Sequence, residues 1–291
     1  MVNVYITGGC GYIGSRVYTE LHKLGFIITS IDLETYGNPG LLNNEDTFKD
    51  TYINDPTGIL IHLGSVSSVS LCKKFRYESI QVNVVEATKF MLERVNVAKM
   101  IYASSSCLYG KGFNCTEETP PNLTDDLSIV KYSLDSYMQI SCTKPFYGLR
   151  FGSVNGWSPN LRTDLMINSM NESAKNSRKV LVSNPEFYRP IISTQDVVSS
   201  ILAIINSNGV KSGIYNVHSY NQKIGDIATE VANYHSVPLV VNAGNPTFDF
   251  TLDSSKFCNA FDWKPSTKCT LDILDDLRKE PVLKGDRIVN V

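Results

Sequence analysis

The stretch VNVYITGGCGYIGS, residues 2–15, decides the fold of this chain. Residues 2–6 are predicted to form a short buried strand, and a helical pattern opens near residue 15. Gly8 permits a tight turn from strand to helix, Gly11 lets the backbone approach a pyrophosphate, and Gly14 lets the helix pack closely on the strand. The unpaired N–H groups and the dipole of the helix then form an anion site.

A second apolar run, residues 26–31, ends at Asp32. This spacing is expected of a carboxylate that accepts hydrogen bonds from both hydroxyls of a ribose. Strand, glycine triplet, helix, strand and acid thus follow in the order of a dinucleotide-binding βαβ unit. The sequence therefore predicts a nucleotide site, and a glycine-rich turn in an unrelated α/β domain is the alternative.

The composition excludes several classes of protein. The chain has 291 residues, 42% of them hydrophobic, and a net charge of −2, so neither nucleic acid nor an anionic membrane is expected as a partner. It has no run of about 18 apolar residues that could span a membrane. Seven cysteines without Cys-x-x-Cys spacing, and a start unlike a secretory signal, predict a cytoplasmic protein with reduced thiols. The four histidines lack metal-ligand spacing, so no metal site is expected.

Alternating strand and helix patterns predict an α/β fold with a doubly wound, Rossmann-like parallel sheet. Further strands are predicted at residues 59–63, 99–103, 146–151 and 214–217, and helices at residues 80–95, 128–140 and 197–205. Ligands of such sheets collect beyond the carboxyl ends of the strands. Beyond about residue 156 the pattern loosens. We expect a dinucleotide-binding domain at 1–155 with a return segment near 190–217, and a smaller C-terminal substrate-binding lobe at 156–189 and 218–291.

Several further motifs complete a likeness to a known family. They are IHLG at 61–64, VNV at 82–84, SSSCLYG at 104–110, LRFGSVNG at 149–156, and RP at 189–190 followed by TQDVV at 194–198. With the glycine loop they resemble the extended short-chain dehydrogenase/reductase family of nucleotide-sugar epimerases, dehydratases and reductases. The resemblance covers nearly the whole chain. It implies a nicotinamide cofactor, a nucleotide-sugar substrate and hydride transfer at a sugar carbon.

The resemblance also assigns residues to both ligands. The cofactor residues would be Gly8, Gly11, Tyr12, Ile13, Gly14, Asp32, Leu33, Leu63, Gly64, Ser65 and Asn83. Because Asp32 is followed by Leu33 and Glu34, no cation awaits a 2′-phosphate, which favours NAD over NADP. The substrate residues would be Ser106, Ser153, Arg162, Asn168 and Arg189, and Arg189 would pair with the diphosphate. A solvated arginine at 162 and a helix-surface asparagine at 168 are the alternatives.

The catalytic pair of the family is missing from the sequence. The family's base is a tyrosine, and a lysine four residues later holds the nicotinamide ribose and lowers the pKa of that tyrosine. No tyrosine of this chain has a lysine at that spacing. In the favoured register, Ile129 takes the tyrosine position and Ser133 the lysine position. Ile129 has no proton to exchange, and Ser133 carries no charge.

Three interpretations remain open. Tyr132 or Lys131 would reach the site through a shifted helix register, although one residue is about 100° around a helix. Alternatively, the chemistry has moved to Ser105, which by resemblance contacts the reacting hydroxyl, to Cys107, or to His62 or a residue of the lobe. SSCxY at residues 105–109 resembles the motif of the GDP-fucose synthases, whose cysteine is an acid/base, although packing is the alternative role of Cys107. In the third interpretation the chain binds both ligands without the usual turnover.

The leading expectation is an NAD-dependent nucleotide-sugar epimerase or 4-keto reductase. The alternative is a non-catalytic or altered-mechanism member that keeps both ligand sites. Residues 106–107 lack the Asp-Glu pair that the family's 4,6-dehydratases carry, which argues against dehydration. By resemblance, the chain would form a homodimer through the helices near 80–95 and 128–140.

Overall fold

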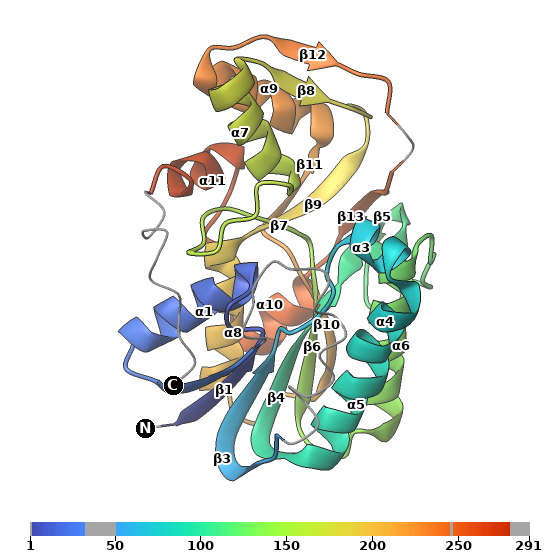
Figure 1. Cartoon of the computed structure of the whole chain (residues 1–291), viewed down its shortest axis with the longest axis vertical. Helices are drawn as coiled ribbons and strands as arrows, with labels where there is room; N and C mark the ends of the chain where they lie inside the picture. The colour runs from blue at the N-terminus through green and yellow to red at the C-terminus, as the bar shows by residue number, and fades with distance from the viewer. Residues whose placement is uncertain (1, 33–50, 245–246, 280–291) are drawn as a thin grey trace.

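A six-stranded parallel sheet forms the centre of the molecule (Figure 1). The computed structural model describes residues 2–32, 51–244 and 247–279. The strand order is β2-β1-β3-β4-β6-β10, and every neighbouring pair is parallel. The strands are β1 (Asn3–Thr7), β2 (Ile27–Ile31), β3 (Ile53–His62), β4 (Val95–Ser105), β6 (Phe146–Phe151) and β10 (Gly213–Val217). The predicted doubly wound sheet is confirmed, and the strand near 214–217 joins it.

Helices cover both faces of the sheet (Figure 1). One face carries α1 (Tyr12–Lys23), α8 (Thr194–Asn206) and α10 (Ser255–Phe261), which share a core with the strands. The other face carries α6 (Asp126–Ser141) and the helical segments that precede β4. In both helical layers, apolar residues at helical spacing face the sheet. In α1, for example, these residues are Val17 and Leu21. Within the described ranges, no helix has the length and apolar character needed to cross a bilayer.

The helix predicted at 80–95 differs in detail. After α3 (Val69–Lys74), the chain forms α4 (Arg76–Ile80), the π-helical turn η2 (Gln81–Glu86), α5 (Ala87–Lys89) and a second π-helical turn η3 (Phe90–Arg94). Val95 already belongs to β4, because Val95 and Val97 alternate as buried strand residues. β3 also starts at Ile53, before the predicted residue 59. Its pairing with β4 is irregular between Asp55 and Ile59, so its first residues do not show the apolar pattern of a buried strand.

A smaller lobe stands above the carboxyl edge of the sheet (Figure 1). Its three-stranded sheet has the order β11-β9-β7, with β7 (Ser153–Asn155), β9 (Tyr188–Ser193) and β11 (Tyr220–Lys223). A second core joins α7 (Met166–Ser177), α9 (Ile224–His235) and α11 (Thr270–Asp276). Two strand pairs complete the fold: β8 (Val180–Val182) with β12 (Leu239–Val241), and β5 (Lys111–Cys115) with β13 (Asp249–Leu252). α10 and the following Trp263, which the prediction placed in the lobe, pack on the main sheet.

Candidate functional site

The turn from β1 into α1 is closed by backbone contacts. Gly8 has a φ of +73°, and a Cβ there would lie 2.5 Å from Gly64 N. A Cβ at Gly14 would lie 1.9 Å from the carbonyl oxygen of Gly8. Gly11 is the N-cap of α1 and brings no side chain to cap the helix. Gly8 and Gly14 therefore tolerate no side chain, and the first-turn N–H groups remain available to an anion.

Asp32 lies beside this turn. It follows β2, and its Oδ2 accepts a hydrogen bond from Cys10 N at 2.6 Å. Leu33, the next predicted cofactor residue, lies outside the described residues, as does Glu34.

The loop after β3 forms a second wall against the turn. The N–H of Leu63 donates to the carbonyl of Thr7 at 2.9 Å. Asn83 holds the loop, because it accepts from Val66 N at 2.8 Å and donates to Val66 O at 2.9 Å. Its buried amide is therefore engaged by the backbone, and Asn83 positions the loop that carries Gly64 rather than presenting its side chain to solvent.

His62, the last residue of β3, is buried beneath the site. Its Nδ1 lies 2.7 Å from Thr7 Oγ1. Burial, with a smaller contribution from the charge of Lys131, lowers the pKa of His62 to about 3. The imidazole is therefore neutral at neutral pH.

The serine-rich end of β4 leads into the short 3₁₀ helix η4 (Ser106–Tyr109). Ser105 caps η4 by accepting from Cys107 N at 3.3 Å and is only half-buried, whereas Ser106 and Cys107 are buried. Burial raises the pKa of Cys107 to about 12, and its side chain belongs to an apolar cluster with Leu127. Ser105 is thus the most accessible hydroxyl of this strand end, and Cys107 is a protonated thiol.

One face of α6 lies against the sheet and the strand ends. Its buried residues are Leu127, Ser128, Val130, Lys131, Leu134, Asp135 and Met138. Lys131 Nζ donates to Ser65 Oγ at 3.1 Å and to Ala103 O at 2.8 Å, so it links the ends of β3 and β4. Leu127 lies one turn earlier on the same buried face. Tyr132 is half-buried and lies off that face.

Arg189 places a cation in the lobe, on β9. Its Nη2 donates to Thr247 Oγ1 at 2.7 Å, and its guanidinium lies 5.3 Å from the ring centroid of Phe248. Nη1 is buried and makes no hydrogen bond to the described residues. Burial lowers the pKa of Arg189 to about 10, against the opposing effect of Asp249, so the side chain remains charged at neutral pH.

Two other predicted substrate residues stand at the base of the lobe. Arg162 pairs with Asp164 at 2.6 Å and donates to Ser67 Oγ at 3.2 Å, so it joins the lobe to the loop after β3. Asn168 accepts from Gly156 N at 2.9 Å and donates to Arg162 O at 2.8 Å. Because Asn168 is only 1% exposed, its interpretation as a helix-surface residue is wrong.

The remaining predicted ligand residues present little free side chain. The phenol of Tyr12 is buried and donates to Gly156 O at 2.7 Å, and Ile13 packs against the core. A ligand can therefore contact Tyr12 and Ile13 only through their backbone N–H groups in the first turn of α1. Ser153 is half-buried, is the first residue of β7 and pairs with Ile191 of β9.

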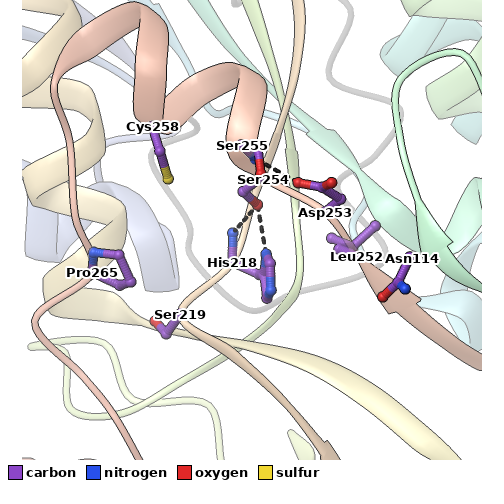
Figure 2. Close-up of a pocket in the computed structure, with 9 residues that line it drawn as sticks. All are labelled: Asn114, His218, Ser219, Leu252, Asp253, Ser254, Ser255, Cys258 and Pro265. Atoms are coloured by element: carbon purple, nitrogen blue, oxygen red, sulfur yellow. Dashed lines mark hydrogen bonds between the residues drawn. The ribbon is translucent and has the colours of Figure 1, made fainter.

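A pocket of about 390 Å³ lies beyond the end of β10, around His218 (Figure 2). The Nδ1 of His218 lies 2.5 Å from Ser254 Oγ, and its Nε2 lies 3.0 Å from Asn221 Nδ2. Asn221 also exchanges two hydrogen bonds with the backbone of Leu252, which fixes Nδ2 as the donor. Nε2 therefore accepts and Nδ1 carries the proton. His218 cannot act as a base toward Ser254, so the pair is not a hydrolase dyad.

Comparison with known proteins identifies the family. The model of the NAD dependent epimerase/dehydratase family matches residues 4–217, which is more than half of the chain. The chain belongs to this family. Its curated relatives include the ADP-L-glycero-D-manno-heptose-6-epimerase of Brachyspira hyodysenteriae, 26% identical over 75% of this chain and 76% of that protein. The UDP-glucose 4-epimerase of Lactobacillus helveticus is 23% identical over 94% of this chain and 95% of that protein.

Solved structures of similar proteins have the same fold as this chain. The UDP-glucose 4-epimerase of Thermotoga maritima, in complex with UDP-glucose, has a TM-score of 0.80 at 19% identity and covers 96% of this chain and 99% of its own. MoeE5, in complex with UDP-glucuronic acid and NAD, has a TM-score of 0.78 at 18% identity and covers 95% and 99%.

The residues at the β1–α1 turn fit NAD, the cofactor of the family. Gly8 and Gly14 leave the space that side chains would fill, α1 offers its first-turn N–H groups, and Asp32 offers a carboxylate for a ribose. NAD would supply the hydride chemistry at this edge.

The family's catalytic helix requires a correction to the predicted register. Ile129 is 45% exposed, and the hydroxyl of Ser133 bonds back to Ile129 O on the outer side of α6. The register that gave these two residues the tyrosine and lysine positions is therefore wrong. Lys131 is the lysine that faces the site, and Leu127, four residues earlier, stands where the tyrosine would be. This face of α6 therefore carries a lysine at residue 131 and an apolar side chain, not a phenol, at residue 127.

Sequence reasoning also missed a buried network behind Lys131. Asp135, one turn further along α6, accepts from Arg150 Nε at 2.9 Å, from Ser104 Oγ at 3.0 Å and from Tyr102 OH at 3.1 Å. It ties α6 to β4 and β6 next to Ser105. The apolar spacing of residues 127, 130, 134 and 138 was the available signal, since it places 131 and 135 on the buried face.

Proposed function

We propose that this chain binds NAD and a nucleotide-sugar and transfers hydride at a sugar carbon, in an epimerase or 4-keto reductase reaction. The supporting observation is the convergence of three elements at one edge of the sheet. The glycine turn contacts Gly64, the adjacent Ser65 accepts from Lys131, and Lys131 also bonds the β4 end that carries Ser105. The names of the curated relatives agree with this chemistry.

Arg189 supports a nucleotide-sugar as the substrate. The Nη1 of its buried guanidinium has no partner among the described residues and belongs to the lobe above the carboxyl edge of the sheet (Figure 1). A guanidinium suits the paired oxygens of a diphosphate. Ser106 and Ser153 are further proposed contacts.

The second candidate function is ligand binding without the family's usual turnover. Leu127 favours it, because an apolar side chain at the tyrosine position cannot exchange a proton. In this case the turn, Asp32 and Arg189 would still bind both ligands.

The deciding experiment incubates the protein with NAD or NADH and a panel of UDP-, GDP-, dTDP- and CDP-sugars, including 4-keto sugars. Chromatography with mass detection is expected to show a new isomer or the gain or loss of a hydrogen pair. Arg189→Leu should abolish conversion while NAD binding by calorimetry stays unchanged. No conversion across the panel, with NAD bound, would favour the second function, and no NAD binding would contradict both.

We also infer a homodimer and a cytoplasmic location. Large apolar side chains are exposed on the α4–η3 segment and on α6, namely Tyr77, Ile80, Val85, Ile129, Tyr137 and Ile140. Two such faces would form a four-helix interface, which light scattering of the purified protein tests. All seven cysteines are free thiols, which suits a reducing compartment.

A further inference from the structure

We propose that Lys131 itself exchanges the proton of the reacting sugar hydroxyl, in place of the absent tyrosine. This inference rests on the function proposed above. It assigns the lysine a role beyond holding the cofactor.

The surroundings of Lys131 leave part of its ammonium group unsatisfied. The side chain is 4% exposed, and Nζ makes two hydrogen bonds, to Ser65 Oγ and Ala103 O. An ammonium has three N–H donors, so one finds no partner among the described residues. Among the residues that the structure describes, no carboxylate lies within ion-pair distance of Nζ. A buried cation without a counter-ion is costly, and losing its proton relieves that cost.

The groups that face Lys131 do not offset this effect. Burial lowers the pKa of Lys131, while Cys107, Asp135 and Cys72 oppose the shift. Asp135 is already paired with Arg150 at 2.9 Å, and both thiols have pKa values raised by burial, so they are neutral at neutral pH. His62 is neutral as well. Lys131 is thus the group at this edge whose loss of a proton is favoured by burial, with no neighbouring charge to offset it.

The other candidates fit the role less well. Cys107, with a pKa of about 12, would expose almost no thiolate at neutral pH. Leu127 has no exchangeable proton, and Tyr132 lies off the buried face of α6. Ser105 can hydrogen-bond the hydroxyl but needs a base to receive the proton.

The proposed step balances. The free amine of Lys131 takes the proton of the sugar hydroxyl and becomes an ammonium. The C–H electron pair leaves with its hydrogen as hydride, oxidised nicotinamide is reduced, and the carbon–oxygen bond becomes a carbonyl. In the return step the ammonium gives the proton back as hydride returns to the carbon.

The test combines a titration with rates. In cofactor-free protein labelled with ¹³C at the lysine ε-carbon, the resonance that disappears in Lys131→Met reports Lys131. It should titrate clearly below the ordinary lysine value of about 10.4. The rate of sugar oxidation should rise with pH through the same midpoint. Lys131→Arg, which stays protonated, should bind NAD but lose about a hundredfold in rate and that pH dependence.

Lys99→Arg is the matched control. Lys99 is also partly buried, and its Nζ donates to backbone carbonyls of Ile204 and Ile205 at the end of α8, away from the site. Its substitution should leave the rate unchanged.

Several results would overturn the assignment. An ordinary Lys131 titration, or a Lys131→Arg enzyme with the wild-type rate and pH profile, would reduce Lys131 to a cofactor contact. If Cys107→Ser is inactive while Lys131→Met remains active, the proton transfer would belong to the thiol of Cys107. If wild-type protein binds NAD but converts no sugar, the proposed function fails together with this inference. Conversion that persists in both Lys131 variants defeats this inference alone.

Discussion

The β1–α1 turn and helix α6 meet at the same edge of the sheet, yet they keep different shares of the family's machinery. In the turn, Gly8, Gly14 and Asp32 all stand where a dinucleotide needs them. In α6, Lys131 reaches the strand ends, but the residue four positions earlier on the same buried face is Leu127. The proposed roles in cofactor binding and proton transfer thus belong to separate elements, so that one can change while the other is retained.

Disrupting the turn should have the largest effect. Gly14→Ala would place a Cβ 1.9 Å from Gly8 O, so α1 must move away from β1. We expect a loss of about a hundredfold in NAD affinity, equivalent to about 2.7 kcal/mol. Calorimetric titration measures it. Gly209→Ala is the control, since it strains a backbone φ of +73° without placing a Cβ within 4 Å of another atom. Equal losses in both variants would point to general instability.

Restoring the phenol should sharpen the contrast. Leu127→Tyr places a tyrosine one turn before Lys131, and the ammonium form of Lys131 would lower the pKa of that phenol. We expect turnover at neutral pH to rise by tenfold or more, within the usual range of a general acid/base. Ile129→Tyr, on the exposed side of α6, is the control and should give no gain. A gain from Ile129→Tyr alone would restore the register rejected here.

The smallest expected effect concerns the rim of the turn. Asp32→Ala should weaken NAD binding roughly tenfold, about the value of a charge-assisted hydrogen bond. Asp32→Asn keeps an acceptor for Cys10 N and separates the charge from the local contact. An unchanged affinity of Asp32→Ala for NAD would show that this carboxylate does not bind the cofactor.

Some of the site was predictable because its requirements are local. The need for glycine at residues 8 and 14 arises within one strand–turn–helix unit, so the spacing of the letters carries it. Asp32 lies one strand away, and its contact with Cys10 N follows from the same unit. The hydrogen bonds between the Asn83 amide and the backbone of Val66 were not predictable, because local spacing does not reveal a contact between separate elements.

The sequence by itself determined the parallel sheet, the cofactor turn and the absence of a tyrosine–lysine pair at the family spacing. Only the tertiary structure decided which residues of α6 face the site. A shift of one residue turns a helical side chain by about 100°, and the buried face is selected by packing against strands distant in sequence. Asp135 illustrates how packing orients α6. Its hydrogen bonds to Ser104 and Arg150 hold the helix with Lys131 facing inward and Ile129 facing outward.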